Sequence, residues 1–418
     1  MDEKQERRLR RKAIRLWLQG VSDREIQQHV SRSLGWIHKW QQRYTDSGWS
    51  GLQSQSHRPH QPTGYANAVC QLVLRVRRQQ SKRKIGRLIG PRAIQREIRR
   101  GCLLPKDQIP SCSTIQRILR AAHLITRVPA KRTRYHPHPR PTADYMIQAM
   151  DWTARFLEGG KKVYAFHTLD LALYALFQTI SDNKHSVTAQ THSLNTWEKQ
   201  GLPHALLIDN DAAWRGSLKA TRHLSHFMRL ALWLGIELIF IPVAEPEYNG
   251  TLERVNGLWN QQFWNLRHFE SLAQVARTSP QFVEWYCTQY EPPNLNDHPP
   301  SEMRQQVNSI RLTYRQRQSI PETLPLTEWR IHFIRCVDEH CDIELLHETW
   351  HIDKRLAGEY VWATIFLHEH CLRIYHRRSP SERVRLRKIF HYPLDEPVVP
   401  LQAQFKRYER RRNMFTML

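Results

Sequence analysis

Residues 205–211 read Ala-Leu-Leu-Ile-Asp-Asn-Asp, four apolar residues followed at once by two carboxylates and an amide. A short apolar run of this kind predicts a buried strand, and the change to acidic residues predicts that the strand ends at Asp209. An acidic residue at the end of a strand often only caps a turn. The stretch therefore decides the fold only together with the sequence around it.

The sequence on both sides of this stretch alternates between short β-rich runs and longer helix-compatible runs. The residues before it favour three strands joined by short connections, which is typical of an antiparallel meander. The residues after it favour a long helix, a further buried strand and a last helix. The predicted order is βββ-α-β-α-β-α, the ribonuclease-H-like layout, an α/β core with a mixed five-stranded sheet. The expected strands are 146–150, 163–169, 174–180, 205–208 and 236–241, and the expected helices are 185–200, 218–234 and one that carries Glu253.

Three carboxylates fall where this layout would bring them together. Asp151 follows the first strand, Asp209 follows the fourth, and Glu253 lies early in the last helix. Attack on a phosphodiester at neutral pH is helped by two hard cations, one at the attacking oxygen and one at the leaving oxygen. Magnesium prefers carboxylate ligands, so these three are the candidate catalytic and metal-binding residues. The rival carboxylates are Asp170, Asp211, Glu245 and Glu247.

Positive charge is concentrated at the front of the chain. The net charge of the 418 residues is +24. Residues 1–140 hold 31 Lys and Arg against 8 Asp and Glu, whereas residues 141–310 hold 13 against 17. A basic front joined to a slightly acidic middle is typical of a polyanion-binding arm attached to another module. A merely soluble basic surface would explain a diffuse excess better than this one.

The front of the chain predicts a helix-turn-helix. A helix over 8–19 stops at Gly20, and Ser22 and Glu25 form a capping-box pair for a short second helix. A third helix carries free basic and polar residues, which is the arrangement that reads the major groove. An ordinary three-helix bundle has the same apolar spacing, and the charge favours DNA binding. The residues expected to contact DNA are Arg32, His38, Lys39 and Arg43.

A second helical unit follows a polar linker. Helices are expected over 91–100 and 113–122, the latter capped by Ser111 or Ser113. They suggest a second helix-turn-helix or winged-helix-like module. The Pro-rich stretch 127–141 is not helical, and we expect it to lie extended against phosphates, with a solvated tether as the alternative. The basic residues expected to face DNA here are Arg117, Arg120, Lys131, Arg132 and Arg134.

The last third of the chain favours short alternating strands separated by polar turns. Four to five strands in so short a segment suggest a small β-barrel. This barrel would serve either as a stability or dimerisation module, or as a docking site for DNA or a partner. The expected strands are 329–337, 343–346, 360–367 and 372–375, and a basic tail follows at 406–412.

On these motifs the chain resembles bacterial insertion-sequence DDE transposases with a retroviral-integrase-type catalytic core. The most specific motif is Asn249-Gly250-x-x-Glu253-Arg254, and this match selects Glu253 as the third carboxylate. Residues 150–152 and 208–210 match the motifs of the other two carboxylates. The resemblance extends to the front helix-turn-helix and to residues 90–120, so it covers nearly the whole chain.

The resemblance implies cleavage at transposon ends and joining of the 3′ ends to target DNA. It implies two Mg²⁺ ions per active site, with Mn²⁺ as a substitute, and a homo-oligomer assembled on paired ends. An accessory ATPase or targeting protein is a candidate partner. Asn249 and Arg254 become candidate secondary residues of the site.

The chain departs from the family pattern at Asp211, where the family usually has Gly after the second Asp-Asn. A carboxylate at this place could crowd the metals or add a ligand, and its charge would raise neighbouring carboxylate pKa values. Two alternatives therefore stay open. One is a transposase-derived, sequence-specific DNA-binding protein whose catalysis has lapsed. The other is a ribonuclease-H-type nuclease that does not join strands, against which the two sequence-reading units argue.

Composition also bears on where the protein works. No apolar stretch long enough to span a membrane is present, and seven scattered Cys without a Cys-x-x-Cys motif favour reduced thiols. We expect a bacterial, cytoplasmic, nucleoid-associated protein with no membrane contact. The expected domains are 1–55 and 63–126 for the two DNA-binding units, 127–144 for the basic linker, 145–308 for the catalytic core, 322–395 for the barrel and 396–418 for the tail.

Overall fold

The computed structural model describes residues 3–54, 66–83, 85–126, 137–142, 145–216, 220–304 and 309–406. The chain divides into two compact units, Met1–Gln71 and Leu72–Leu418. No helix among the described residues is both long and apolar enough to cross a membrane. Of the residues expected to bind DNA, Lys131, Arg132 and Arg134 lie outside the described part of the chain.

The first unit is the predicted set of three helices. The capping box forms as expected, because Ser22 caps the second helix and the Glu25 side chain accepts from the Ser22 N–H. Ser33 caps the third helix. Ile26, Val30 and Ile37 fill the space between the helices. The helices are α1 (Glu3–Leu18), α2 (Asp23–Val30) and α3 (Leu34–Ser47), followed by the 3₁₀ turn η1 (Gly48–Leu52).

Three more helices follow, of which the sequence predicted two, and the boundary between the two compact units falls inside the first of them. Ser111 caps the last of them, as expected, through the Thr114 N–H. The first was not predicted, although its apolar residues Leu72, Val73 and Val76 form one buried side. The helices are α4 (Asn67–Ser81), α5 (Pro91–Arg100) and α6 (Cys112–Ala121).

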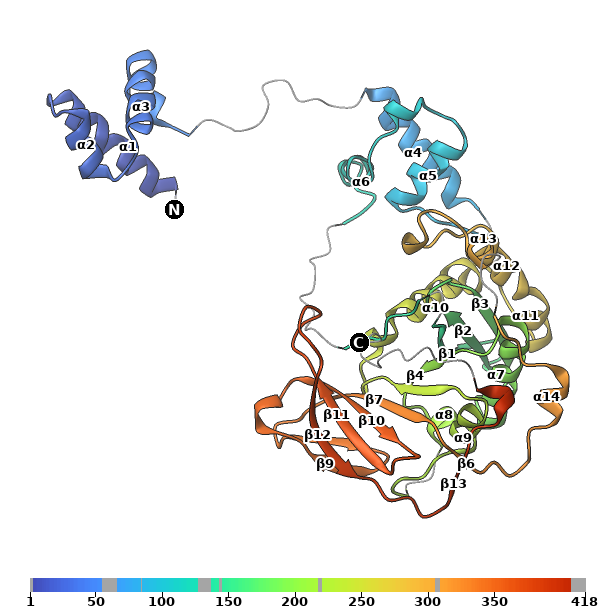
Figure 1. The fold of residues 1–418 in the computed structure, drawn as a ribbon. Coiled ribbons are helices and arrows are strands. Elements are labelled where there is room, and N and C mark those ends of the chain that lie inside the picture. Colours follow the sequence, from blue (N-terminus) through green and yellow to red (C-terminus); the bar gives the residue numbers. More distant parts are fainter. Residues whose placement is uncertain are drawn as a thin grey trace. The chain divides into compact units, whose positions relative to one another are not determined.

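A mixed sheet forms the centre of the second unit (Figure 1). The element order of the core is the predicted one, with an antiparallel β1-β2-β3 meander and two further strands parallel to β1. The strands are β1 (Ile147–Phe156), β2 (Lys162–Asp170), β3 (Leu176–Ser181), β4 (Ala205–Ile208) and β5 (Glu237–Phe240). The helices between and after them are α7 (Ser186–Gln200), α8 (Ala212–Arg215), α9 (His226–Trp233) and α10 (Gly250–Gln262).

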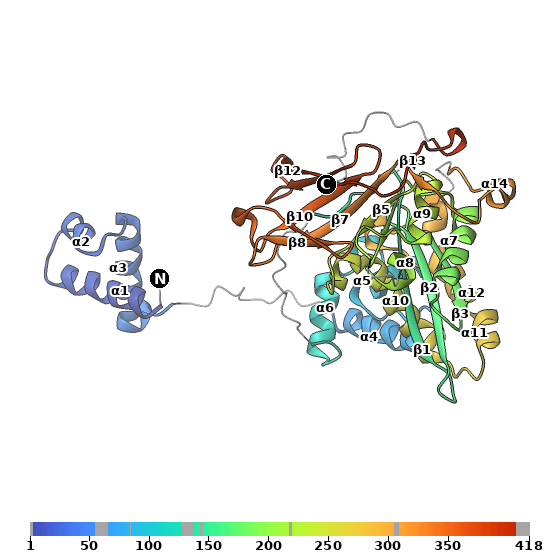
Figure 2. The same cartoon turned by 90° about the horizontal axis from the view of Figure 1, so that it is seen from below.

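The sheet has nine strands, so the prediction of five was wrong. Its order is β12-β11-β10-β7-β5-β4-β1-β2-β3. The C-terminal strands continue the core sheet, because β7 pairs in parallel with β5 (Figure 2). The separate small barrel expected over 322–395 is not confirmed. The strands are β7 (Arg330–Cys336), β10 (Tyr360–Phe366), β11 (Cys371–His376) and β12 (Arg385–His391), with the hairpin β8 (Asp342–Leu345) and β9 (Glu348–His351) and the pair β6 (Leu326–Thr327) and β13 (Val398–Val399) beside them.

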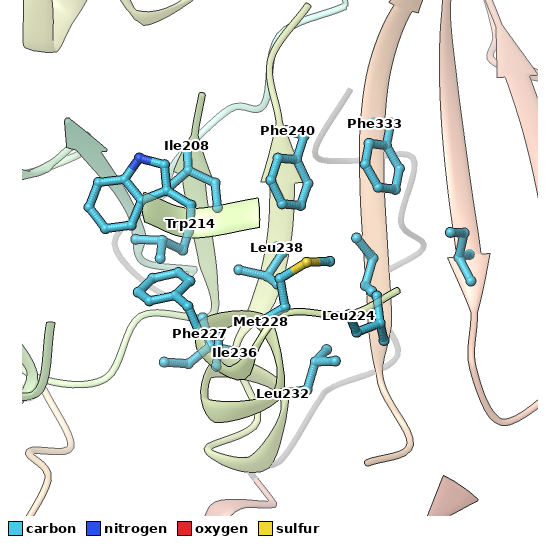
Figure 3. Close-up of a cluster of buried hydrophobic side chains, with 14 of the residues drawn as sticks. Ile208, Trp214, Leu224, Phe227, Met228, Leu232, Ile236, Leu238, Phe240 and Phe333 are labelled. Atoms are coloured by element: carbon cyan, nitrogen blue, oxygen red, sulfur yellow. The ribbon is translucent and has the colours of Figure 1, made fainter. Parts of the chain in front are cut away.

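Burial explains why β7 joins the sheet. Every residue from Ile331 to Arg335 is buried, as expected for a strand covered on both faces. Phe333 stacks on Phe240 of β5 with 5.0 Å between ring centroids and 10° between ring planes. Both rings belong to the apolar cluster that also holds Trp214 and Phe227 (Figure 3). The C-terminal strands and the core therefore share one hydrophobic interior.

Two predicted boundaries in the core were wrong. The first strand does not end at Asp151, because β1 stays paired with β2 as far as Phe156. The helix expected over 218–234 is shorter, since α9 begins at His226 with Ser225 as its cap. The remaining helices lie after α10 and are α11 (Leu272–Thr278), α12 (Pro280–Thr288), α13 (Pro300–Arg304) and α14 (Tyr314–Gln318).

Candidate active site

Strand register brings Asp151 and Asp209 side by side. Ala149 of β1 lies opposite Leu207 of β4 in the parallel pair. The two aspartates each follow their pairing residue by two positions, and side chains two apart in an extended chain point to the same face. That face is the one on which Ala149 and Leu207 pack with α10. Although β1 continues, it leaves β4 after Ala149, which opens the edge where the carboxylates lie.

Glu253 reaches the same place from α10. Leu252, Val255 and Trp259 are buried against the sheet and fix the helix there. Glu253, in the first turn, lines a cavity of about 310 Å³ together with Asp151 and Asp209. Asn249 lines the same cavity, whereas Arg254 lines a different one. The three predicted carboxylates thus come from β1, the end of β4 and α10 and share one cavity.

The surroundings of Asp151 and Asp209 disfavour the state in which both carboxylates are charged. Burial, followed by repulsion from Asp209, raises the pKa of Asp151 to about 7, against hydrogen bonds from the Trp152 N–H and the Asn256 amide. Burial also raises the pKa of Asp209, and the nearby charge of Asp211 adds to this effect. A divalent cation between such carboxylates would favour their charged forms.

The donor set suits a hard divalent cation. Mg²⁺ prefers carboxylate oxygens and keeps several of its waters, and an open cavity lined by three carboxylates offers both. Among the described residues no three acidic, His or Cys side chains are already drawn together as ligands of one ion. Asp151 is instead held by hydrogen bonds from the Trp152 N–H and the Asn256 amide.

The shifted pKa of Asp151 predicts a pH dependence of stability for the metal-free protein. Its pKa of about 7 lies above the ordinary 3.8, so between these values the folded state binds more protons than the unfolded state. Stability should therefore fall as pH rises from about 4 to about 7, by up to roughly 4 kcal/mol, and stay level above that. Urea unfolding in EDTA across this range, beside Asp151→Asn, measures it. If the free energy of unfolding depends on pH in the same way in both proteins, the raised pKa of Asp151 is contradicted.

A partly buried chain of hydrogen bonds orients Asp151. The Asn256 amide donates to Asp151 Oδ2 at 2.9 Å, and its oxygen accepts from His167 Nδ1 at 2.6 Å. Gln178 Nε2 lies 2.6 Å from His167 Nε2, so its N–H donates there and fixes the tautomer. Burial lowers the pKa of His167 to about 4, so the imidazole is neutral. Asn256, one helical turn after Glu253, was missed by sequence reasoning, and that i+3 spacing is the signal that could have found it.

Asp211, the departure from the family pattern, is engaged in local structure. It is the N-cap of α8, where its Oδ1 accepts the Ala213 N–H at 2.9 Å. Its Oδ2 accepts from Lys184 Nζ at 2.7 Å. Its own N–H donates to Asp209 Oδ1 at 3.1 Å. Asp211 therefore lines the cavity with both oxygens occupied, and its backbone helps to hold Asp209.

Arg335 of β7 supports the loop after Asp209. Its side chain is 7% exposed and donates to Asn210 Oδ1 at 2.7 Å. It also donates to the carbonyls of Ile241 and Glu344, at 2.9 and 3.1 Å. Burial lowers the pKa of Arg335 to about 9, so it stays charged at neutral pH. Sequence reasoning missed this residue because its segment was expected to form a separate domain.

The rival carboxylates have other partners. Asp170 accepts the N–H groups of Ala172 and Leu173 in a turn and lies outside this cavity. Glu245 lines the cavity, and its Oε2 accepts from the Tyr360 hydroxyl at 2.5 Å. The side chain of Glu247 lies outside what the structure describes.

The residues expected to bind DNA differ in their exposure to solvent and in the partners of their side chains. Arg32 pairs with Glu6, and Arg43 lies over the Trp40 ring at 4.8 Å. His38, 3.0 Å from Asp23, and Lys39 are exposed on α3. The exposed Gln42, one turn beyond Lys39, joins this surface and was missed. Arg117 and Arg120 are exposed on α6.

Comparison with known proteins gives similarities to both parts. Residues 4–53 match the model of the homeodomain-like domain, which confirms the helix-turn-helix expected at the front. The HTLV-2 integrase catalytic core in complex with magnesium is 14% identical with a TM-score of 0.29, over 38% of this chain and 95% of that chain. The simian T-cell lymphotropic virus intasome in complex with a PP2A regulatory subunit is 13% identical with a TM-score of 0.33, over 72% and 100%. The BIV integrase core is 13% identical with a TM-score of 0.28, over 38% and 93%.

Proposed function

We propose that this protein is a DNA transposase that binds the ends of a mobile element, cuts them and joins their 3′ ends to target DNA. The observation that carries the proposal is the shared cavity of Asp151, Asp209 and Glu253. The homeodomain-like front supports it, because a nuclease that cuts without regard to sequence needs no reading module. The expected setting is the cytoplasm of a bacterium.

In this mechanism Asp151, Asp209 and Glu253 would hold two Mg²⁺ ions, for which Mn²⁺ would substitute. When bound, such ions lower the pKa of an attacking water or 3′-hydroxyl and stabilise the leaving oxygen. Asn256 holds Asp151 and the Asp211 N–H holds Asp209, so the pair is oriented before DNA arrives. Orientation of this kind lowers the entropic cost of reaching the reactive arrangement.

The same proposal implies an assembly. Two ends must be brought together before they are joined, so we expect a homo-oligomer on paired ends. Transposon-end DNA and target DNA are the expected partners, with an accessory ATPase or targeting protein as a further candidate.

Strand transfer by the purified protein tests the proposal. A labelled duplex carrying the end sequence that flanks the gene is incubated with target DNA in Mg²⁺, beside Asp209→Asn and beside EDTA. We expect joined products that vanish in both controls. Specific end binding with no cleavage in Mg²⁺ or Mn²⁺ would favour the lapsed, DNA-binding alternative. Cleavage without joining would favour a nuclease.

Lys39, which is exposed on α3 with its ammonium 5.7 Å from the centroid of the Trp40 ring, predicts a salt effect on end binding. Lys39→Gln should weaken binding about equally for all sequences and reduce the slope of log K against log salt by roughly one. Arg32→Gln should change the slope less, because that guanidinium already pairs with Glu6. Binding isotherms at four salt concentrations measure both slopes. Equal slopes for Lys39→Gln and the unaltered protein would indicate that the phosphate contacts lie outside α3.

A further inference from the structure

A second cavity borders the first turn of α10, where its lining includes Gly250, Thr251 and Arg254. It has a volume of about 160 Å³, and its lining includes Tyr174, Tyr286, Tyr290 and Arg254. Tyr286 and Tyr290 are buried, at 1% and 8% exposed, whereas Tyr174 is only partly buried. A single water needs roughly 10–15 Å³ in the same measure. The cavity therefore has space for a ring system.

The two cavities are neighbours through α10. Asn249 and Glu253 line the catalytic cavity, whereas Gly250, Thr251 and Arg254 line the second one. A helix with its side chains is about 10–12 Å across, and DNA advances about 3.4 Å per nucleotide along each strand. A nucleotide in the second cavity would therefore lie within about three positions of a phosphate beside Glu253.

The aromatic rings are held in place around this cavity. Tyr286 and Tyr290 stack with 5.0 Å between centroids and 28° between ring planes. The Tyr174 hydroxyl accepts from Asn294 Nδ2 at 2.6 Å, and Tyr174 has a φ of 57°. A bulky residue seldom adopts this left-handed conformation. The turn between β2 and β3 therefore presents this ring at some cost in backbone strain.

Arg254 supplies a cation at the same cavity. It is exposed, and no described carboxylate forms an ion pair with it. The arginines of α5 nearby differ, because Arg96 pairs with the buried Glu291 at 2.6 Å and Arg92 pairs with Asp297 at 2.9 Å. Arg254 is thus the cation at this cavity that is left for an external anion.

We propose that this cavity takes an unstacked nucleobase of the transposon end, with the Tyr174 ring against the base and Arg254 at its phosphate. Aromatic rings stack on every base, and arginine binds phosphate through paired N–H groups. This inference rests on the proposed function, since it takes DNA as the substrate of the neighbouring carboxylates. The base would be one within about three nucleotides of the cut.

Binding to DNA that lacks one base tests the inference without catalysis. The full chain is titrated in EDTA with end duplexes in which one position near the cut is abasic. Tyr174→Asn removes the ring while Asn tolerates the left-handed backbone, and Tyr174→Phe is the matched control that keeps the ring. Loss of the stacked base should weaken binding of the unaltered protein and of Tyr174→Phe roughly tenfold at one position. Tyr174→Asn should show no such loss.

Two further arms complete the test. Arg254→Gln should weaken binding of the intact end several-fold, whereas Arg277→Gln, an exposed arginine of α11, should not. The inference is overturned if Tyr174→Asn keeps the full abasic effect, if no position shows one, or if the effect appears only with an abasic target duplex. If the ends are bound specifically but the abasic effect does not depend on the Tyr174 ring, the proposed function is unaffected. If the abasic effect depends on the Tyr174 ring but no strands are joined in Mg²⁺, only the proposed function is contradicted.

Discussion

Glu253→Gln is expected to abolish cutting and joining while end binding stays intact. The change removes one of the three negative charges at the cavity and keeps the size of the side chain. A cation held by two carboxylates in place of three would bind more weakly and stabilise the leaving oxygen less, so we expect a loss of at least roughly a thousandfold. End binding should persist, because the reading helix belongs to the other compact unit. Denaturing gels of labelled ends measure the chemistry, and a gel shift measures the binding.

Glu245→Gln is the matched control for this prediction. It makes the same chemical change in a residue that lines the same cavity, but Glu245 is bonded to the Tyr360 hydroxyl. We expect it to keep activity to within about tenfold. Joining by Glu253→Gln would show that Glu253 is the wrong carboxylate. A larger loss of activity in Glu245→Gln than in Glu253→Gln would point to Glu245 instead.

Local sequence patterns predicted the front helices and the core well because these elements are short and clearly bounded. The apolar run before Asp209 and the capping pair Ser22 and Glu25 each give a signal within a few residues, and each is found. The helix expected to begin at 218 failed because its start was inferred from apolar content alone, whereas Ser225 caps the helix that forms. Caps set boundaries more sharply than hydrophobic spacing does.

Pairing between distant segments could not be predicted in the same way. Four of the C-terminal strands, β7, β8, β10 and β11, were predicted one by one, whereas β9 and β12 were missed. Alternation also does not tell which strand lies beside which. The pairing of β7 with β5 depends on contacts such as that of Phe333 with Phe240. The same limit applies to the site. Glu253 was found by its motif, whereas Asn256 and Arg335 act through contacts with residues about a hundred positions away.

Arg335→Gln is expected to slow joining about 10- to 100-fold without weakening end binding, the range seen when a residue that orients metal ligands is lost. Arg335 donates to Asn210 Oδ1 and to the Ile241 carbonyl, and both residues line the cavity of Asp151, Asp209 and Glu253. A shorter side chain would take this donor from Asn210 Oδ1, whereas the Ile241 carbonyl still accepts from Asn210 Nδ2 at 2.8 Å. An acceptor that is left unpaired costs about 1–3 kcal/mol. Thermal unfolding must therefore accompany the rate measurement, at a temperature where both proteins are folded.

Two comparisons separate positioning by Arg335 from simple loss of stability. Arg222→Gln removes the salt bridge between Arg222 and Glu348 of the β8-β9 hairpin, and neither residue lines the cavity. It should therefore lower stability and leave the joining rate of the folded protein unchanged. Asn210→Ala should slow joining as Arg335→Gln does, and the double variant should be little slower than either one, because both act on the same loop. Rates that multiply in the double variant, or a loss in Arg222→Gln as large as in Arg335→Gln, would show that β7 only stabilises the sheet. Rates that do not multiply would make the C-terminal strands part of the catalytic site, since the loop that carries Asp209 would then depend on a side chain that only β7 supplies.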